Sequence, residues 1–368
     1  MKKNILFIIY THSLGGGAER ILTNIANGLD PEKYNIDILE YADYGVKEED
    51  IRQGITRCRP IVSMKKDGRI KRVWKNIQVY SYAGLLRRRK KKYDLEISFN
   101  YLIPTFLLSG KCPAIAWFHG GIGNLKERPY YRWLQRRSLK KVARLVTISE
   151  NTRNSVLEIY PEMADRMEVI YNGFDLGEIT KAGNEACDIR LETPSILYVG
   201  RLEEGKDPLV LLEVVRFLQR RGKKVFLYFI GQGEKQEEIR KKIREYELGS
   251  QVSLLGYQMN PYSLMRQSRA ICMMSKNEGF PTVFAEGMAL GIPFISTPVG
   301  GVKELADGGK CGKVVNSIEE CAKAIEECVL NETENLKMSE ECLRHIKKFG
   351  LDAQIRQVER LIDEVIGG

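Results

Sequence analysis

Residues 270–297 read AICMMSKNEGFPTVFAEGMALGIPFIST and contain a predicted strand, helix and strand in close succession. The apolar ends, AICMMS (270–275) and PFIST (293–297), are typical of strands that are covered on both faces. Pro281 stands where the helix between them is expected to begin, because proline is favoured at the first helical position. A strand–helix–strand unit of this kind indicates a parallel β-sheet.

The same alternation runs through the whole chain of 368 residues. In the first half we expect strands at 4–10, 35–41, 94–100, 114–119, 144–149 and 167–171. In the second half we expect strands at 195–200, 224–231, 252–256, 270–275, 293–297 and 313–315. The stretch 174–194 is polar and without a clear period, which predicts a linker, and only helices are expected after residue 318. We therefore predict an α/β fold with two Rossmann-like, doubly wound parallel-sheet domains that face a cleft, where ligands bind beyond the strand ends.

The composition excludes several other classes of protein. No apolar run approaches the roughly 20 residues of a membrane span. Lys2 and Lys3 lead directly into ILFIIY (5–10), which we interpret as a first strand and not as a signal peptide. The eight cysteines include no C-x-x-C pair, so neither a disulfide framework nor a zinc site is expected. A cytoplasmic location fits best.

Positive charge is concentrated in one part of the chain. Residues 51–150 hold 24 Lys and Arg against 5 Asp and Glu, whereas the remaining residues hold 34 against 43. A single basic run is usually a solvated face. Three basic runs lie in one half of the chain, at 63–72, 87–92 and 134–141, and Trp and Tyr residues are interleaved with them. This combination favours an anionic membrane surface or a polyanionic partner. A nucleic-acid-binding protein is a competing interpretation, but it leaves the second half of the chain unexplained.

Two cations follow a predicted strand of the second half. VGRLEEGK (199–206) places Arg201 and Lys206 directly after it. Each alone is most simply a surface cation. Together at a strand end they can neutralise a diphosphate, because arginine offers a planar fork and lysine a point charge.

The helix expected at Pro281 has no residue that can cap it, since Phe280 lacks a side-chain oxygen. The N–H groups of Thr282 and Val283 therefore need a partner, and an anion suits the positive end of the helix. Glu278 before the helix and Glu286 within it can each accept hydrogen bonds from a vicinal diol. A phosphate site between two such carboxylates is the arrangement expected for binding a nucleotide sugar.

The first half offers weaker signals at its strand ends. Three glycines at 15–17 precede a helix, and they serve either a plain tight turn or a close approach to phosphate. His12 and His119 both follow predicted strands near glycines. Histidines are usually structural, but the position of His119 in AWFHGG (116–121) favours a functional role.

These residues together resemble a known family. EGFPTVFAEGMALGIPFISTPVGGVKEL (278–305) is similar to the E-x7-E region of retaining glycosyltransferases of the GT-B fold, family 4. Further matches follow in the family's order over nearly the whole chain: GGGAER (15–20), FHG (118–120), TISE (147–150), IYNGFD (170–175), VGRL (199–202) with Lys206, and IGQGE (230–234). One departure is Met274-Ser275, where the family often has Pro-Ser.

The resemblance implies a GT-B fold with an acceptor-binding domain at 1–175 and a donor domain at 190–350. A C-terminal helix at 351–368 would cross back onto the first domain. It also implies a metal-independent, retaining hexosyltransferase, in which the leaving diphosphate deprotonates the acceptor. The absence of a D-x-D motif agrees with the lack of a metal or other cofactor.

The resemblance also implies roles for single residues. Arg201 and Lys206 would hold the leaving diphosphate, Glu278 would contact the hydroxyls of the donor sugar, and His119 would lie beside that sugar. The implied donor-binding residues are Gly16, Gly17, Gly279, Phe280, Pro281, Thr282, Val283 and Glu286. Those at 279–283 would bind through backbone amides, and Glu286 would contact the ribose.

The partners implied are a nucleotide sugar and a glycan or lipid-linked acceptor in cell-surface polysaccharide synthesis. A UDP-sugar is favoured on family grounds, while GDP-mannose and ADP-glucose stay open because no side chain reads the base. A nucleotide-sugar-binding protein without catalysis is a further alternative, which the intact Glu278, Arg201 and Lys206 argue against.

Overall fold

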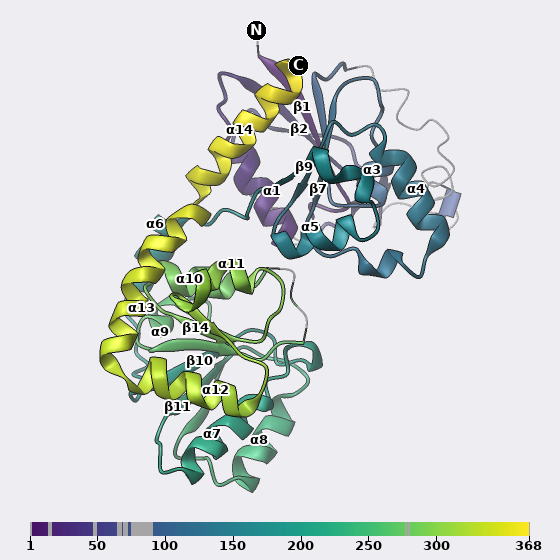
Figure 1. Ribbon diagram of the computed structural model, residues 1–368. Helices are drawn as coiled ribbons and strands as arrows, with labels where there is room; N and C mark the ends of the chain where they lie inside the picture. Colours follow the sequence, from purple (N-terminus) through teal and green to yellow (C-terminus); the bar gives the residue numbers. More distant parts are fainter. Residues whose placement is uncertain are drawn as a thin grey trace. The chain divides into compact units, whose positions relative to one another are not determined.

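The computed structural model describes residues 2–13, 17–46, 50–64, 68, 73–74, 91–276, 278 and 280–367. The chain forms two compact units (Figure 1). Unit 1 comprises Met1–Gly173 together with Leu351–Gly368, and unit 2 comprises Phe174–Gly350. The last helix of the chain, α14 (Leu351–Gly367), therefore belongs to the same unit as the N-terminal strands.

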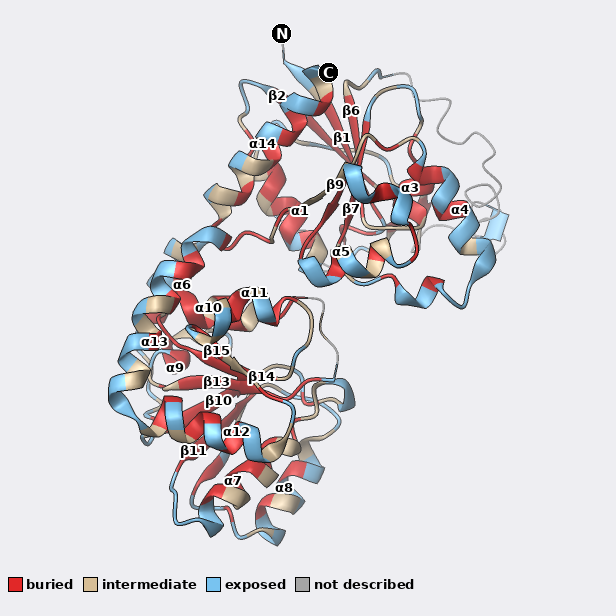
Figure 2. Cartoon of the chain, viewed as in Figure 1, coloured by how far each residue is buried: buried red, intermediate tan, exposed pale blue. Residues whose placement is uncertain are grey.

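Unit 1 is built on a parallel sheet, which has seven strands within the described residues and the order β4-β2-β1-β6-β7-β8-β9. These strands are β1 (Lys3–Ile9), β2 (Tyr34–Glu40), β4 (Thr56–Arg57), β6 (Leu95–Phe99), β7 (Ala114–Phe118), β8 (Arg144–Thr147) and β9 (Met167–Val169). Two short strands, β3 (Ala42–Asp43) and β5 (Val62–Ser63), pair separately. The central strands are buried along their length because helices cover both faces (Figure 2).

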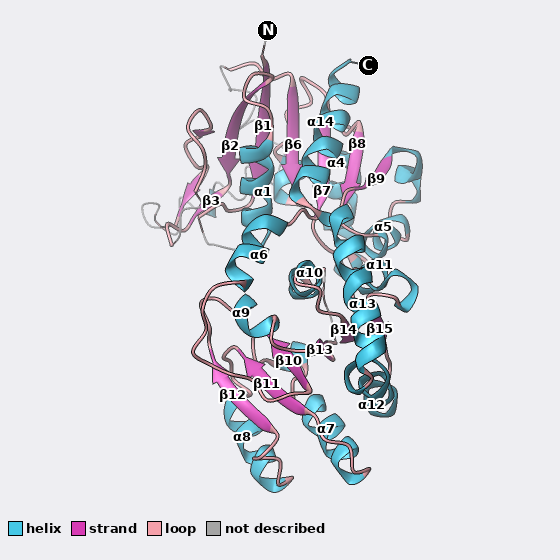
Figure 3. Ribbon diagram, turned by 90° about the vertical axis from the view of Figure 1, so that its left-hand side faces the viewer, coloured by secondary structure: helices cyan, strands magenta, loops and turns pink. Residues whose placement is uncertain are grey.

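The two faces of this sheet carry different helices. Apolar residues of α3 (Ile103–Phe106) and α4 (Pro129–Leu139) pack on the face that presents Leu6 and Ile8. On the other face, α1 (Gly17–Gly28) and α14 lie side by side (Figure 3). Gly28 permits their close approach, since a Cβ there would lie 2.7 Å from Ile355 Cδ1. Other helical segments within the described part of unit 1 are η1 (Gly123–Leu125), α5 (Glu150–Leu157) and η2 (Pro161–Arg166).

Unit 2 repeats the architecture with a parallel sheet of order β12-β11-β10-β13-β14-β15. Its strands are β10 (Ser195–Val199), β11 (Phe226–Ile230), β12 (Val252–Gly256), β13 (Ala270–Met273), β14 (Phe294–Ser296) and β15 (Gly312–Val314). Its α-helices are α6 (Leu176–Gly183), α7 (Val210–Arg220), α8 (Gln236–Glu245), α9 (Tyr262–Met265), α10 (Thr282–Ala289), α11 (Val302–Ala306), α12 (Ile318–Ile325) and α13 (Glu332–His345). Shorter helical segments are η3 (Glu204–Lys206), η4 (Asp307–Gly309), η5 (Glu326–Leu330) and η6 (Ile346–Phe349).

The predicted doubly wound α/β fold is confirmed, but the predicted linker at 174–194 is wrong in part. Its first residues form helix α6, which begins where the side chain of Asp175 accepts a hydrogen bond from Glu178 N–H at 2.9 Å. Ile179 is buried on this helix. Helix α6 packs on α9 and α10, so this segment is part of unit 2.

The strand orders locate the functional edge of each unit. The winding direction of the sheet reverses between β1 and β6 in unit 1, and between β10 and β13 in unit 2. Ligands of open α/β sheets bind outside the carboxyl ends of the strands at such a reversal. In unit 2, the loops at this position are those that follow Val199 and Met273.

Candidate nucleotide-sugar site

The loop after β10 is fixed by its neighbours through backbone contacts. Gly200 N–H donates to Ile230 O at 2.9 Å, and Leu202 N–H donates to Gln232 O at 2.9 Å. A Cβ on Gly231, whose φ is +133°, would lie 1.9 Å from Gly200 O. The glycines of the GQGE turn are therefore needed for close packing of two loops, whatever contact they make with a ligand.

Arg201 occupies the tip of this loop. Its side chain is 77% exposed, and its Nη1 lies 2.8 Å from Glu203 Oε2. The backbone beneath it is held by Tyr198, whose hydroxyl donates to Arg201 O at 2.6 Å. Burial, with the negative charge of Glu278, raises the pKa of the Tyr198 phenol, so the group stays a neutral donor. Arg201 is thus an exposed cation on a fixed backbone.

Lys206 and Glu278, predicted separately, meet in the structure. They come from the loops after β10 and β13 and form an ion pair with side chains 20% and 11% exposed. Ser275 Oγ donates a second hydrogen bond to Glu278 Oε1 at 3.0 Å. Lys206 also bonds Oε1, and no described residue bonds Oε2. One carboxylate oxygen is therefore held by the protein, and the other is available to a donor such as a sugar hydroxyl.

The start of α10 differs from the prediction by one residue. Pro281 has ψ +93° and is the N-cap, so Thr282 is the first helical residue. No side chain among the described residues caps this helix. Phe284 N–H donates to Pro281 O at 3.1 Å, whereas the N–H groups of Thr282 and Val283 have no acceptor within the helix. The helix start therefore remains suited to an anion.

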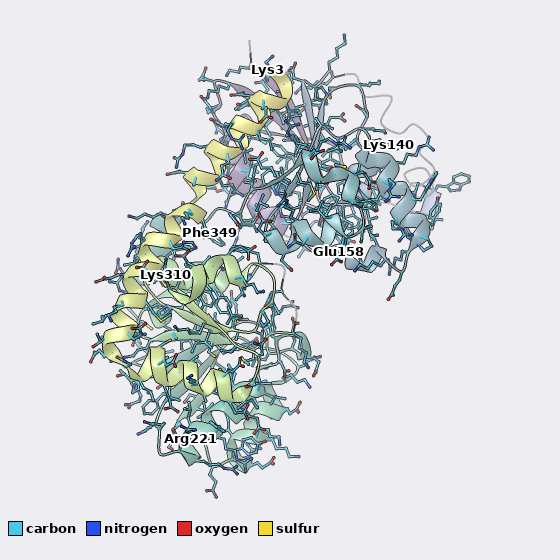
Figure 4. The ribbon with its side chains drawn as sticks, in the orientation of Figure 1. Lys3, Lys140, Glu158, Arg221, Lys310 and Phe349 are labelled. Carbon is cyan, nitrogen blue, oxygen red and sulfur yellow. The ribbon has the colours of Figure 1, made fainter. Side chains whose placement is uncertain are left out.

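The other predicted residues around α10 lie in different environments. Phe280 is buried, with its ring stacked on that of Phe174 at a centroid distance of 6.2 Å and tilted against that of Phe349 at 6.0 Å (Phe349 is labelled in Figure 4). Its side chain therefore anchors the turn in the core of unit 2, and only its backbone could line a ligand. Val283 and Glu286 are half-buried on the helix. Gly279 lies outside the described residues.

A network of ion pairs, which we did not predict, joins three loops beside these residues. Glu204 Oε1 lies 2.7 Å from Lys276 Nζ, and its Oε2 lies 2.8 Å from Lys235 Nζ. Hydrogen bonds from these two lysines lower the pKa of Glu204 to about 2. Lys276 N–H also donates to Gly205 O at 3.0 Å. The loop that carries Lys206 is therefore tied to the loop that carries Glu278.

In unit 1, His119 follows β7 and packs on aromatic rings. Its ring centroid lies 4.1 Å from that of Phe99 and 6.1 Å from that of Trp117. Desolvation lowers the pKa of His119 to about 3, so the imidazole is neutral at neutral pH. Its Nε2 is buried without a hydrogen-bond partner in the described part of the chain. A neutral, unsatisfied imidazole at a strand end is suited to bind a ligand hydroxyl.

Only part of the glycine-rich turn lies within the described residues. Gly16 lies outside the described residues. Gly17 is exposed at the start of α1 and would have room for a Cβ. The preceding loop is fixed by Glu40, whose Oε2 accepts from His12 N–H at 2.9 Å and from Ser13 Oγ at 3.0 Å. The contact of Gly16 and Gly17 with phosphate remains a prediction.

Backbone strain marks another strand end that the sequence did not reveal. Asn100 and Leu102, just after β6, have φ of +117° and +60°, which non-glycine residues rarely adopt. Buried Gln135 supports this turn, because its Oε1 accepts from Leu102 N–H at 2.6 Å and from Thr105 Oγ1 at 3.0 Å. The turn lies at the winding reversal of unit 1, where a ligand site is expected.

The three basic runs have different surroundings. Most of residues 65–90 lie outside the described residues, whereas Lys91 is paired with buried Asp37 at 2.8 Å. Helix α4 presents Tyr130 and Trp133 with 57% and 54% exposure. The Arg137 guanidinium lies 5.8 Å from the Trp133 ring centroid. Lys140, labelled in Figure 4, follows at the end of the helix. The described basic surface thus combines cations with exposed aromatic rings.

No group of His, Cys, Asp and Glu in the described ranges has the arrangement to hold a metal ion. None of the described helices is long and apolar enough to cross a membrane.

Known protein families match both halves of the chain. The family model "Glycosyl transferases group 1" matches residues 185–345, and "Glycosyltransferase Family 4" matches residues 15–178. A similar protein is an α-1,4-N-acetyl-D-galactosaminyltransferase of Campylobacter jejuni, named for a PP-undecaprenol-linked saccharide. It is 25% identical, with 98% of each chain covered.

Solved structures share the fold. Anabaena HepE in complex with UDP has a TM-score of 0.73 at 17% identity, covering 99% of this chain and 100% of that one. A glycosyltransferase from Rickettsia africae has a TM-score of 0.76 at 21% identity, covering 99% of each chain. Since the two family models together match most of both units, the chain belongs to the group 1, family 4 glycosyltransferases of the GT-B fold.

Proposed function

We propose that this protein transfers a hexose from a nucleotide sugar, in the first place a UDP-sugar, to a glycan or lipid-linked saccharide. The observation that carries the proposal is the ion pair of Lys206 and Glu278 at the winding reversal of unit 2. In this pair, the Lys206 ammonium can bind a phosphate, and the Glu278 carboxylate beside it can bind sugar hydroxyls through Oε2. Arg201 would add a second cation at the same strand end.

The proposed reaction retains the configuration at the anomeric carbon and uses no metal. The bond between the anomeric carbon and the phosphate oxygen breaks, and the acceptor oxygen attacks from the same face. The acceptor proton passes to the departing phosphate oxygen. Lys206, Arg201 and the N-terminus of α10 stabilise the negative charge that develops on that phosphate. Glu278 orients the sugar and forms no covalent bond.

The acceptor is proposed from the relatives. Two transferases of Campylobacter jejuni are named for saccharides linked to undecaprenol through a diphosphate: one is 25% identical over 98% of this chain, and the other is 33% identical over 41% of it. We propose an acceptor of this chemical class and a cytoplasmic enzyme that works at a membrane surface. Exposed Tyr130 and Trp133 among the cations of α4 favour docking on anionic lipid, because amphipathic aromatic rings prefer the interface.

The experiment that tests the function is a screen of donor hydrolysis. UDP-N-acetylgalactosamine, UDP-N-acetylglucosamine, UDP-glucose, GDP-mannose and ADP-glucose are incubated with the protein, and the released nucleotide is measured. We expect slow hydrolysis of one or more UDP-sugars. Preferred hydrolysis of GDP-mannose or ADP-glucose would contradict the proposed UDP-sugar donor but would still support the proposed transfer reaction. No hydrolysis and no binding of any donor would refute the proposal.

A further inference from the structure

The Glu278 carboxylate accepts hydrogen bonds from two different side chains, and both bonds are to Oε1. One is the ammonium of Lys206, on a flexible four-carbon stem. The other is the hydroxyl of Ser275, at 3.0 Å. In the proposed function, on which this inference rests, Lys206 must bind the donor phosphate, and its interaction with Glu278 then weakens. A carboxylate held only by Lys206 would lose its orientation at that moment.

Ser275 is fixed independently of Lys206. It follows β13 and is 2% exposed. Its carbonyl accepts a hydrogen bond from Thr297 Oγ1 at 2.5 Å, and Thr297 follows the neighbouring strand β14. The backbone of Ser275 is therefore held at the ends of two paired strands, by contacts that do not involve Lys206.

We propose that Ser275 is a positioning residue that keeps Glu278 directed at the donor sugar while Lys206 binds the phosphate. Oε1 stays on the Ser275 hydroxyl, so Oε2 keeps its direction toward the sugar hydroxyls. It follows that Ser275 contributes to recognition of the sugar and not of the nucleotide. A residue with only a structural role would affect both or neither.

The test compares binding of UDP with binding of UDP-N-acetylgalactosamine, UDP-N-acetylglucosamine and UDP-glucose by calorimetry. In Ser275→Ala, we expect affinity for the sugar nucleotide that the wild type prefers to fall about tenfold, because a hydrogen bond to a charged group is lost. The affinity for UDP should stay unchanged. Ser275→Thr, which keeps the hydroxyl, should restore sugar-nucleotide affinity, and Thr297→Val should give a smaller loss of the same kind.

Ser268→Ala is the matched control, since it removes another buried hydroxyl of unit 2, one that donates to Met265 O at 2.8 Å. It should bind all four probes as the wild type does. Equal losses for UDP and the sugar nucleotide in Ser275→Ala, or no loss for either, would overturn the inference. Failure of the proposed function is distinguished by the wild-type protein, which would then bind neither UDP nor any sugar nucleotide. In that case the inference about Ser275 would also be wrong.

Discussion

Replacement of Lys206 by alanine should lower the rate of donor hydrolysis by about two orders of magnitude. Removing one group that stabilises developing charge costs about 2.7–4 kcal/mol, or about 100- to 1000-fold in kcat. The lower end applies here, because the Lys206 side chain keeps 20% exposure and water screens part of its charge. The change also leaves Glu278 without a cation, which should lower the free energy of unfolding by about 1–3 kcal/mol.

The assay must separate these two effects. Hydrolysis is measured under saturating donor, the affinity for UDP by calorimetry, and folding by thermal unfolding. Lys181→Ala serves as the control, because Lys181 pairs with Glu178 at 3.8 Å on the exposed surface of the same unit. The double variant Lys206→Ala, Glu278→Gln removes the unpaired charge. It should regain stability but not activity, because the phosphate still lacks its cation and the sugar loses the Glu278 carboxylate. Hydrolysis within threefold of the wild type in Lys206→Ala would refute the role of Lys206.

Three other predictions concern metal, membrane and pH. Activity should survive excess EDTA, and a loss that magnesium or manganese restores would contradict the metal-independent mechanism. The protein should sediment with anionic but not neutral liposomes at low salt, and Trp133→Ser should weaken this binding whereas Tyr257→Ser, at an aromatic of unit 2 that is 69% exposed, should not. Because burial lowers the pKa of His119 from 6.5 to about 3, its stabilising contribution is present above pH 6.5 and is lost as the pH falls toward 3. His119→Gln should therefore gain thermal stability relative to the wild type below pH 6.5, and parallel pH curves would contradict this reading.

The sequence predicted the sheets and the loops of the site, for a physical reason. Strands covered on both faces are continuous apolar runs, and parallel strands bring their carboxyl ends to one edge of the sheet. Arg201, Lys206 and Glu278 could therefore be assigned to one edge before their contacts were known. Helix α6 was missed because it is a single short amphipathic segment, and its N-cap Asp175 looked like part of a polar linker.

The contacts between these loops could not be predicted, since they depend on which strands are neighbours. The ion pair of Lys206 with Glu278 and that of Glu204 with Lys276 each join residues 72 positions apart. They exist because β10 and β13 are adjacent. Likewise, Phe280 was expected to line the ligand through its backbone amide, and the surroundings of its ring were not predicted. Its ring is buried because two distant parts of unit 2 supply Phe174 and Phe349 to pack against it.

The central claim is retaining transfer from a nucleotide sugar, and proton NMR of donor hydrolysis tests it most directly. The wild-type protein is incubated with the α-linked UDP-sugar that it hydrolyses fastest, and the anomeric signals are recorded before the free sugar equilibrates. The account predicts that the α-anomer of the free sugar appears first and that Lys206→Ala forms it about 100-fold more slowly. Appearance of the β-anomer first, or no consumption of any donor, would contradict it.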